Sequence, residues 1–552
     1  DTPEYPVELP NEILHNILIW LHPADLPEVS LVCRRFYFLI KENQRLCEDI
    51  YRLRLDAPPE NAPIWDWEAE LRDIVRLDEI FHTSRGNYVE KDVSNMQKFL
   101  VPLSQQPNST GSDMSQAHRL PFVYKTVNRL LKHASLNGRS RDEGEESQRP
   151  VSRNVEYLSG LFEKNEVATR VFTQQSPLFD RINSRFEGSV TPFPEPLEKH
   201  QQSAKLHCLY GRPAQQGGRT RSTTTYPWAC SKVYDIREYS HLNGWGPFRK
   251  DGSGRVDWEK VEAINILMWK NISTMCPRTD IFDEIWDTPF FGSFANSYVP
   301  TNLPTLSDLD AQDPYGVTGT YYRVVCFLDH SDFIRFNFSN MGIVTDNIPR
   351  PPLDRGEATR LILMDLEVTR IGAPGPGDGL DLPVVHFKGV SRSFDSDFVE
   401  DVHSTLTGSV RLTQEGEVKW SSVSAFDGQE RWRSEGVQVG GVKSARGVVG
   451  TWFDSDYDIH GPVGPTVFWK AADCKNPREA LLKGASEMIM QPEWLEGVVV
   501  TFEGESEDDD DDDDNDEDWD ADLDPIEDEL PGLLEDAEMD LDDVTTRAMG
   551  NT

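Results

Sequence analysis

The chain has 552 residues, of which 38% are hydrophobic, and this length and composition allow two to four domains with cores of their own. Its formal net charge is −40, but residues 503–543 hold 25 acidic and no basic side chains, so the rest carries about −15. A net-negative body argues against nucleic-acid binding, which needs a basic field to replace phosphate counterions. No apolar run approaches the roughly 18 residues that span a bilayer, so we expect no membrane partner either.

Seven cysteines are scattered without any CxxC pair, at positions 33, 47, 208, 230, 276, 326 and 474. This spacing indicates neither a zinc site nor a disulfide framework. Reduced thiols fit the cytosol or the nucleus best, and this is the localisation that we expect. The first residue is Asp1 rather than Met, which indicates a fragment or a trimmed chain.

The N-terminal segment predicts a short amphipathic helix. Pro10 suits the first helical position, where its missing N–H has no intrahelical partner, and Glu12 complements the positive end of the helix dipole. His22-Pro23 ends the helix. A single apolar stripe at helical spacing is formed by Ile13, Leu14, Ile17, Leu18 and Leu21.

A second helix is predicted after a turn or one-turn helix that starts at Asp25-Leu26-Pro27. Its stripe has the same periodicity and contains Val29, Val32, Cys33, Phe36, Leu39 and Ile40. Two helices in about 35 residues cannot bury both stripes against each other, because chains this short rarely supply a sufficient core. Some of this apolar surface therefore belongs to a partner or to the next domain.

The order Leu-Pro, Ile-Leu, Ile-Leu, Leu, Pro, Asp-Leu and Val-Ser-Leu-Val-Cys-Arg-Arg-Phe over residues 9–36 resembles the F-box. In that family the segment binds the Skp linker protein of a cullin-type ubiquitin ligase, and the rest of the chain captures the protein to be ubiquitinated. The alternative is a helical hairpin that only packs on its own chain. The resemblance implies that the positions that face the linker or hold the module together are Leu9, Pro10, Ile13, Leu14, Ile17, Leu18, Leu21, Pro23, Leu26, Val29, Val32, Cys33 and Phe36.

The next part of the chain predicts a helical connector. Apolar positions at helical spacing indicate helices at 64–82 and 119–135, with shorter ones at 93–101, 152–165 and 176–186. The stretches 104–117 and 136–152 are rich in Ser, Gln, Asn, Gly and charge, so we expect surface loops or disordered insertions there. Residues 190–204 are Pro-rich and polar.

The residue composition changes near residue 204. From there on, a β domain of roughly eight to eleven antiparallel strands is predicted, closed as a barrel or packed as a sandwich. Two helices are expected among the strands, at 257–275 with Asp257 as N-cap and at 477–490. Gln414-Glu415-Gly416 predicts a tight hairpin turn. The predicted strands, rich in β-branched and aromatic residues, are LHCLYG (206–211), WACSKVYDI (228–236), TYYRVVCFLD (320–329), DFIRFNF (332–338), RLILMDLEVTR (360–370), PVVHFKGV (383–390), HSTLTGSVRLTQ (403–414), EVKWSSVSAF (417–426), GVVGTWFD (447–454) and TVFWK (466–470).

The runs 243–271, 317–329 and 384–470 resemble the C-terminal region of a group of fungal F-box domain proteins. This resemblance implies an adaptor and names no target. We therefore predict an α+β chain with an F-box at 1–57, a helical connector at 58–203, a β-barrel-like recognition domain at 204–498 and an acidic disordered tail at 499–552. The tail contains spaced leucines. Either this segment folds on a basic or apolar partner, or it only makes the chain more soluble.

The most unusual segment of the predicted β domain is 450–465, where three aspartates alternate. The pattern begins like a calcium loop, but Ile459 and Pro465 stand where that loop needs its turn Gly and its bidentate Glu, so an EF-hand is rejected. A polar loop whose Asp side chains cap turns is the simpler interpretation. Candidate substrate or ligand contacts in this region are Trp452, Asp454, Asp456, Asp458, His460, Arg431 and Arg433.

Catalysis has no positive support in the sequence, because neither GxSxG nor HExxH occurs and the Gly-rich run at 371–379 is interrupted by prolines. We expect no enzyme activity, no metal and no cofactor. The leading hypothesis is a substrate-recognition subunit of a Skp, cullin and F-box ubiquitin ligase. Two alternatives are an F-box protein whose β domain senses a small molecule or glycan, and an acidic-tailed chaperone or chromatin protein.

Overall fold

The computed structural model divides the chain into two units, Asp1–Phe502 and Glu503–Thr552. All of the residues that the structure describes lie in the first unit. They are 9–58, 65–83, 112–135, 138–139, 150–173, 198–211, 221–275, 307–339, 342–344, 350–393, 404–444 and 446–472. The expected acidic tail and the expected helices at 93–101, 176–186 and 477–490 fall outside these ranges.

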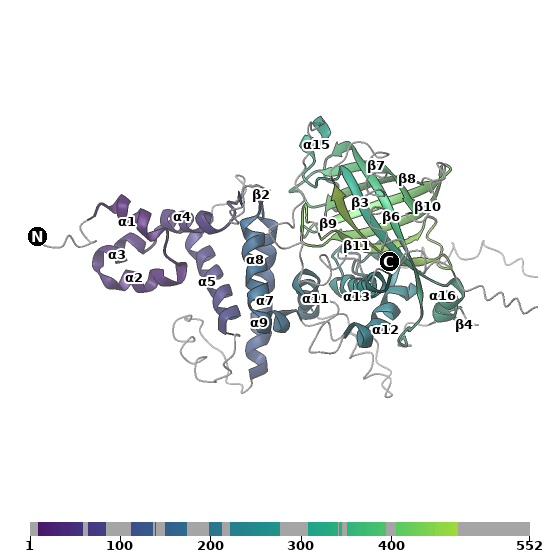
Figure 1. The fold of residues 1–552 in the computed structure, drawn as a ribbon, viewed down its shortest axis with the longest axis horizontal. Helices are drawn as coiled ribbons and strands as arrows, with labels where there is room; N and C mark the ends of the chain where they lie inside the picture. Colours follow the sequence, from purple (N-terminus) through teal and green to yellow (C-terminus); the bar gives the residue numbers. More distant parts are fainter. Residues whose placement is uncertain are drawn as a thin grey trace, which may run out of the picture. The chain divides into compact units, whose positions relative to one another are not determined.

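The N-terminal module consists of α1 (Asn11–Leu18), a 3-10 turn η2 (Pro23–Asp25), α2 (Leu26–Val32), α3 (Arg34–Ile40) and α4 (Gln44–Arg54) (Figure 1). The prediction that the stripe from Val29 to Ile40 lies on one helix is wrong, because the backbone at Cys33 is extended, with φ −157° and ψ 161°. The Cys33 side chain then accepts a hydrogen bond from the Phe36 N–H and caps α3. The second apolar stripe is therefore divided between two short helices.

The connector contains α5 (Trp67–Thr83), α7 (Ser112–Lys132), α8 (Arg153–Lys164) and α9 (Glu166–Phe172). The helices predicted at 64–82, 119–135 and 152–165 are confirmed. The polar stretch 104–117 is not wholly a loop, since α7 begins inside it, and the stretch 136–152 contributes a short ladder of β1 (Gly138–Arg139) and β2 (Pro150–Val151).

Three predicted strands are helices in the structure. The segments at 206–211, 228–236 and 332–338 lie in or at the ends of α11 (Glu198–Tyr210), α12 (Arg221–Tyr234) and α16 (His330–Asn337). Every residue from Ala204 to Gly211 is buried, so α11 shows no alternation of apolar and polar positions that could mark a helix. Helix α11 begins within the Pro-rich, polar stretch 190–204.

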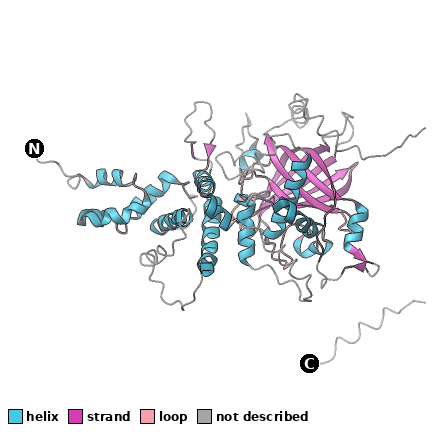
Figure 2. Cartoon of the chain, turned by 60° about the horizontal axis from the view of Figure 1, so that its bottom comes forward, coloured by secondary structure: helices cyan, strands magenta, loops and turns pink. Residues whose placement is uncertain are grey.

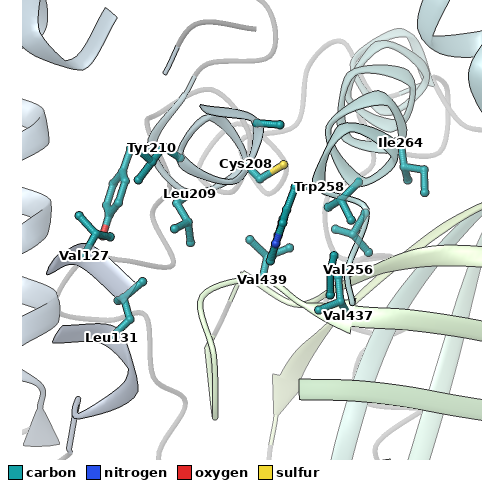
Figure 3. Close-up of a cluster of buried hydrophobic side chains, with 14 of the residues drawn as sticks. Val127, Leu131, Cys208, Leu209, Tyr210, Val256, Trp258, Ile264, Val437 and Val439 are labelled. Carbon is teal, nitrogen blue, oxygen red and sulfur yellow. The ribbon is translucent and has the colours of Figure 1, made fainter. Parts of the chain in front are cut away.

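The helix predicted at 257–275 is confirmed as α13 (Trp258–Met275), with Asp257 accepting a hydrogen bond from the Lys260 N–H. It packs against α11, α12 and the barrel strands β11 (Val448–Asp454) and β12 (Val463–Ala472). Figure 3 shows how this side of the barrel is covered: side chains of α7, α11 and α13 meet Val437 and Val439 in one buried cluster.

Eight antiparallel strands form one closed barrel (Figure 2). Each strand pairs with the next along the chain, and the last strand pairs with the first, so the barrel is an up-and-down meander. Seven of the eight strand predictions between 320 and 470 are confirmed, the exception being 332–338, and β10 was missed because its first half is charged and exposed. The strands are β3 (Gly319–Leu328), β6 (Glu357–Gly372), β7 (Val384–Ser393), β8 (Ser404–Leu412), β9 (Val418–Phe426), β10 (Gln429–Gln438), β11 (Val448–Asp454) and β12 (Val463–Ala472).

The barrel separates two apolar cores. One runs from the N-terminal module through the connector helices to the outward-facing residues of the barrel, and the other lies inside the barrel. The predicted hairpin turn at 414–416 joins β8 to β9, and Gly416 adopts φ +85°, which favours glycine. Within the described ranges, no helix has the length and apolarity that a membrane crossing requires.

Candidate functional site

The first helix of the N-terminal module presents one edge of its stripe to its own core and the other to solvent. Leu14 and Leu18 are 2% and 3% exposed. Ile13 and Ile17 are 45% and 49% exposed, and Trp20, three residues further on, is 70% exposed. The spacing of four and three places these three side chains on one face. The sequence prediction omitted Trp20, although the stripe extended to it would have included it.

The division of the second stripe at Cys33 leaves further large apolar side chains on the surface. Leu31 is 81% exposed, Val32 is 70% exposed and Phe38 is 73% exposed. Leu31 and Phe38 are absent from the predicted partner-binding set. Their exposure depends on the break between α2 and α3, and no local sequence signal shows that break.

Polar contacts hold this small module together. The Arg35 guanidinium donates to the Leu9 carbonyl at 2.5 Å and to the Asn11 side chain at 2.9 Å, which ties α3 to the start of α1. His15 and Asp49 lie 2.8 Å apart and join α1 to α4. These polar contacts hold α3 to α1 and α1 to α4. The exposed residues therefore lie on helices that are fixed relative to one another.

The thirteen predicted partner-binding residues fall into three groups by burial. The buried members can only support the fold, whereas the exposed members are free to contact a partner. Buried are Leu14, Leu18, Pro23 and Leu26; half-buried are Leu21, Val29, Cys33 and Phe36; and exposed are Leu9, Pro10, Ile13, Ile17 and Val32.

A buried carboxylate joins the module to the connector. Asp56 is 3% exposed and accepts hydrogen bonds from the Ser152 hydroxyl at 2.5 Å and from the Arg153 N–H at 2.9 Å. It also accepts from the N–H groups of Ser135 and Asn154. One side chain thus caps α8 and fixes the end of α4 to it.

The aspartates predicted as candidate ligands form turns after β11. Asp454 accepts from the Asp456 N–H at 2.8 Å, and Asp458 accepts from the His460 N–H at 2.9 Å. The His460 ring stacks on Phe338 with centroids 4.7 Å apart. In the part of the chain that the structure describes, no three metal-ligating side chains converge. This geometry matches the polar-loop interpretation of the segment.

The remaining predicted residues lie on both sides of the barrel wall. Arg433 donates to the Ser455 carbonyl at 3.0 Å and lies over the Tyr457 ring, so it belongs to the same loop cluster. Arg431 is exposed. Trp452 is only 9% exposed, and its indole N–H donates to the Cys326 carbonyl at 3.0 Å. The structure therefore groups Arg433 with the aspartates and separates Trp452 from them.

Comparison with known proteins identifies the N-terminal module. Residues 7–52 match the family model described as F-box-like. This match supports an F-box protein and, in general, an adaptor role in a Skp, cullin and F-box ubiquitin ligase, a role that is typically non-catalytic. No curated protein and no solved structure matches the chain.

Proposed function

We propose that this chain is a non-catalytic substrate-recognition subunit of a Skp, cullin and F-box ubiquitin ligase. The exposed apolar side chains of the N-terminal module carry this proposal. Across the described ranges, eight of the exposed large hydrophobic side chains lie between residues 9 and 38, and five lie elsewhere. Exposed apolar side chains concentrated in one small module mark a protein interaction site.

The Skp linker is the partner that the F-box-like match favours for this surface. Burial of Ile17, Trp20, Leu31 and Phe38 in a partner would supply the desolvated anchors that dominate interface energies. Aromatic and large aliphatic anchors of this kind suit a stable rather than a fleeting contact.

The β-barrel serves in this proposal as the part that binds the protein to be modified. The adaptor then acts by proximity, because it holds a target lysine near the ubiquitin-loaded enzyme and raises its effective concentration. No chemistry by this chain is required. The domain boundaries predicted from the sequence are also part of this proposal.

The docking surface can be tested with the exposed side chains alone. We expect Ile17→Ala combined with Leu31→Ala to weaken binding of the full chain to a Skp linker protein by about 2–4 kcal/mol, or roughly 30- to 1000-fold. Isothermal titration measures the affinity, and thermal melting checks the fold. Both positions are solvent-exposed, so the melting temperature should not fall.

Leu380→Ala is the matched control, since Leu380 is 83% exposed but lies in the barrel region. It should leave linker binding unchanged. Leu18→Ala is unsuitable for this test because Leu18 is buried and its truncation creates a cavity. Full linker affinity in the folded double variant would sink the proposal.

A further inference from the structure

The strand register defines which side chains point into the barrel. The rings of Tyr321, Phe387, Trp420 and Phe468 contact one another across strands that are not all neighbours, which places them inside. Directly opposed residues of paired strands share a face. Following the pairs around the barrel from Phe468 therefore assigns the inward face of every strand.

The interior has two unlike halves. One half is filled by the apolar cluster around Trp420 and Phe468. In the other half the inward positions are mostly small and polar, and two pairs of hydroxyls are hydrogen-bonded to each other, Ser391 to Ser404 at 2.5 Å and Ser422 to Ser434 at 2.7 Å. Such short side chains cannot fill the width of an eight-stranded barrel.

The polar half is open to water. Val325, Ile362 and Ser422 all belong to the inward face, yet each is partly exposed. An inward side chain can be exposed only if the space in front of it is accessible from one end of the barrel. At that end, Trp432 and Trp452 meet edge to face with their ring centroids 5.2 Å apart.

A buried arginine points into this space. Arg323 lies on the inward face opposite Phe468 and Ile362, at the boundary of the two halves, and is 8% exposed. Its Nε–H donates to the Thr466 hydroxyl at 3.0 Å. Among the described residues, Thr466 is its one hydrogen-bond partner, and no carboxylate pairs with it.

This arrangement is costly for a folded protein without a ligand. Burial lowers the pKa of the Arg323 guanidinium to about 10, so the group is still charged at neutral pH. A buried charge without a counterion destabilises the fold. An anion that enters the open half would remove that cost and use the remaining N–H donors.

We propose that the open half of the barrel binds a small carboxylic acid with an aromatic or aliphatic body, and that the Arg323 guanidinium pairs with its carboxylate. Arg323 is buried in this half, and one buried guanidinium balances one negative charge, which favours a monoanionic carboxylate over a phosphate dianion. Arg360, opposite Val325 on the same face, is exposed and lies over the Phe327 ring. The apolar body packs toward Trp432 and Trp452. An eight-stranded barrel has room for one ligand of this size.

The test uses the full chain and two aromatic probes of the same shape, 2-naphthoate and its uncharged match 2-naphthamide. We expect 2-naphthoate at up to 1 mM to raise the melting temperature and change tryptophan fluorescence, and 2-naphthamide to bind at least tenfold more weakly. Arg323→Met should remove the preference for the acid. The variant should stay folded, because the substitution removes a buried charge that has no counterion. Arg370→Met, an exposed arginine further along β6, is the control and should bind like the parent.

A second variant protects the test against misfolding at Arg323. Ser422→Leu fills the open half while Arg323 is kept, and it should also abolish binding of 2-naphthoate. Equal affinity for the acid and the amide, unchanged binding by Arg323→Met, or no response to 2-naphthoate at 1 mM would overturn the proposal. If a short peptide with a free C-terminal carboxylate binds where 2-naphthoate fails, the small-acid assignment is also wrong. None of these results bears on docking through Ile17 and Leu31, so the two proposals fail separately.

Discussion

Asp365 is a buried acid on the outward face of β6, and it makes the stability of the barrel depend on pH. Its side chain is 2% exposed, and its Oδ2 has no hydrogen-bond partner in the described part of the chain. Burial raises the pKa of the carboxyl from 3.8 to about 7, so the folded chain holds a proton that the unfolded chain releases near pH 4. Stability contributed by this group is therefore lost as the pH rises from about 4 to about 7.

We expect Asp365→Asn to remove this part of the pH dependence. At pH 8 the variant should be more stable than the parent by at most about 4 kcal/mol, because three pKa units correspond to that amount, and at pH 4 the two should be nearly equal. Urea unfolding at both pH values measures the difference. Glu367→Gln is the control, since Glu367 is exposed on the same strand. Equal pH slopes for parent and Asp365→Asn would contradict this account.

For some single residues, the sequence could not predict the direction in which the side chain points. Periodicity placed Ile17 and Leu18 on one apolar stripe, but it could not say that Leu18 faces the module's own core and Ile17 faces solvent. That choice depends on how the helices of the module pack on one another, which is a matter of tertiary structure. Arg323 is absent from the candidate contacts named from the sequence, because its inward direction follows from the closure of the barrel.

At the scale of elements, the secondary-structure predictions failed where a helix is buried on nearly all sides. The strands between 320 and 470 alternate inward and outward positions, and this period of two is readable in the sequence. Helix α11 packs against the connector helices α7 and α9 and against α13, and α12 packs against α13 and β12. Nearly all side chains of α11 from Ala204 on and of the second half of α12 are therefore buried. Aromatic and apolar enrichment without periodicity then indicated strands. The adaptor hypothesis survived these errors because it depended on the N-terminal motif.

The contact between the end of α4 and α8 depends on one side chain, that of Asp56. Asp56→Ala would leave the N–H groups of Ser135, Arg153 and Asn154 without their acceptor in a buried place. We expect a loss of about 2–4 kcal/mol in the free energy of unfolding, measured by urea titration. Linker affinity at a temperature where the variant is folded should be unchanged, because the docking side chains are untouched.

Asp25→Ala is the control for the contact between α4 and α8. Asp25 is exposed and makes no side-chain cap to α2, so its removal should change stability by less than about 0.5 kcal/mol. A similarly small effect of Asp56→Ala would show that this contact is held by apolar packing of α4 on α5 instead.

For the whole molecule, the two proposed activities lie on different parts of the chain, which makes them separable. The docking side chains are on α1, α2 and α3, whereas target binding is assigned to the barrel. A full chain carrying Ile17→Asp and Leu31→Asp should therefore keep its target but lose its ligase, since a charge at a desolvated interface centre is strongly unfavourable. Substitution is preferable to deletion of the module, because α4 packs on α5 and its removal would uncover that helix.

Affinity purification of this docking-deficient chain should enrich proteins that the parent chain holds only briefly before they are ubiquitinated. Proteins retained by the variant should also have longer half-lives in cells that express it, because bound target is no longer brought near the conjugating enzyme. The parent chain carrying Leu380→Ala is the matched control and should behave like the parent. If the docking-deficient chain retains the same proteins in the same amounts, with unchanged half-lives, then the barrel does not select targets for ubiquitination. A function based on the barrel's ligand alone would then be the better explanation.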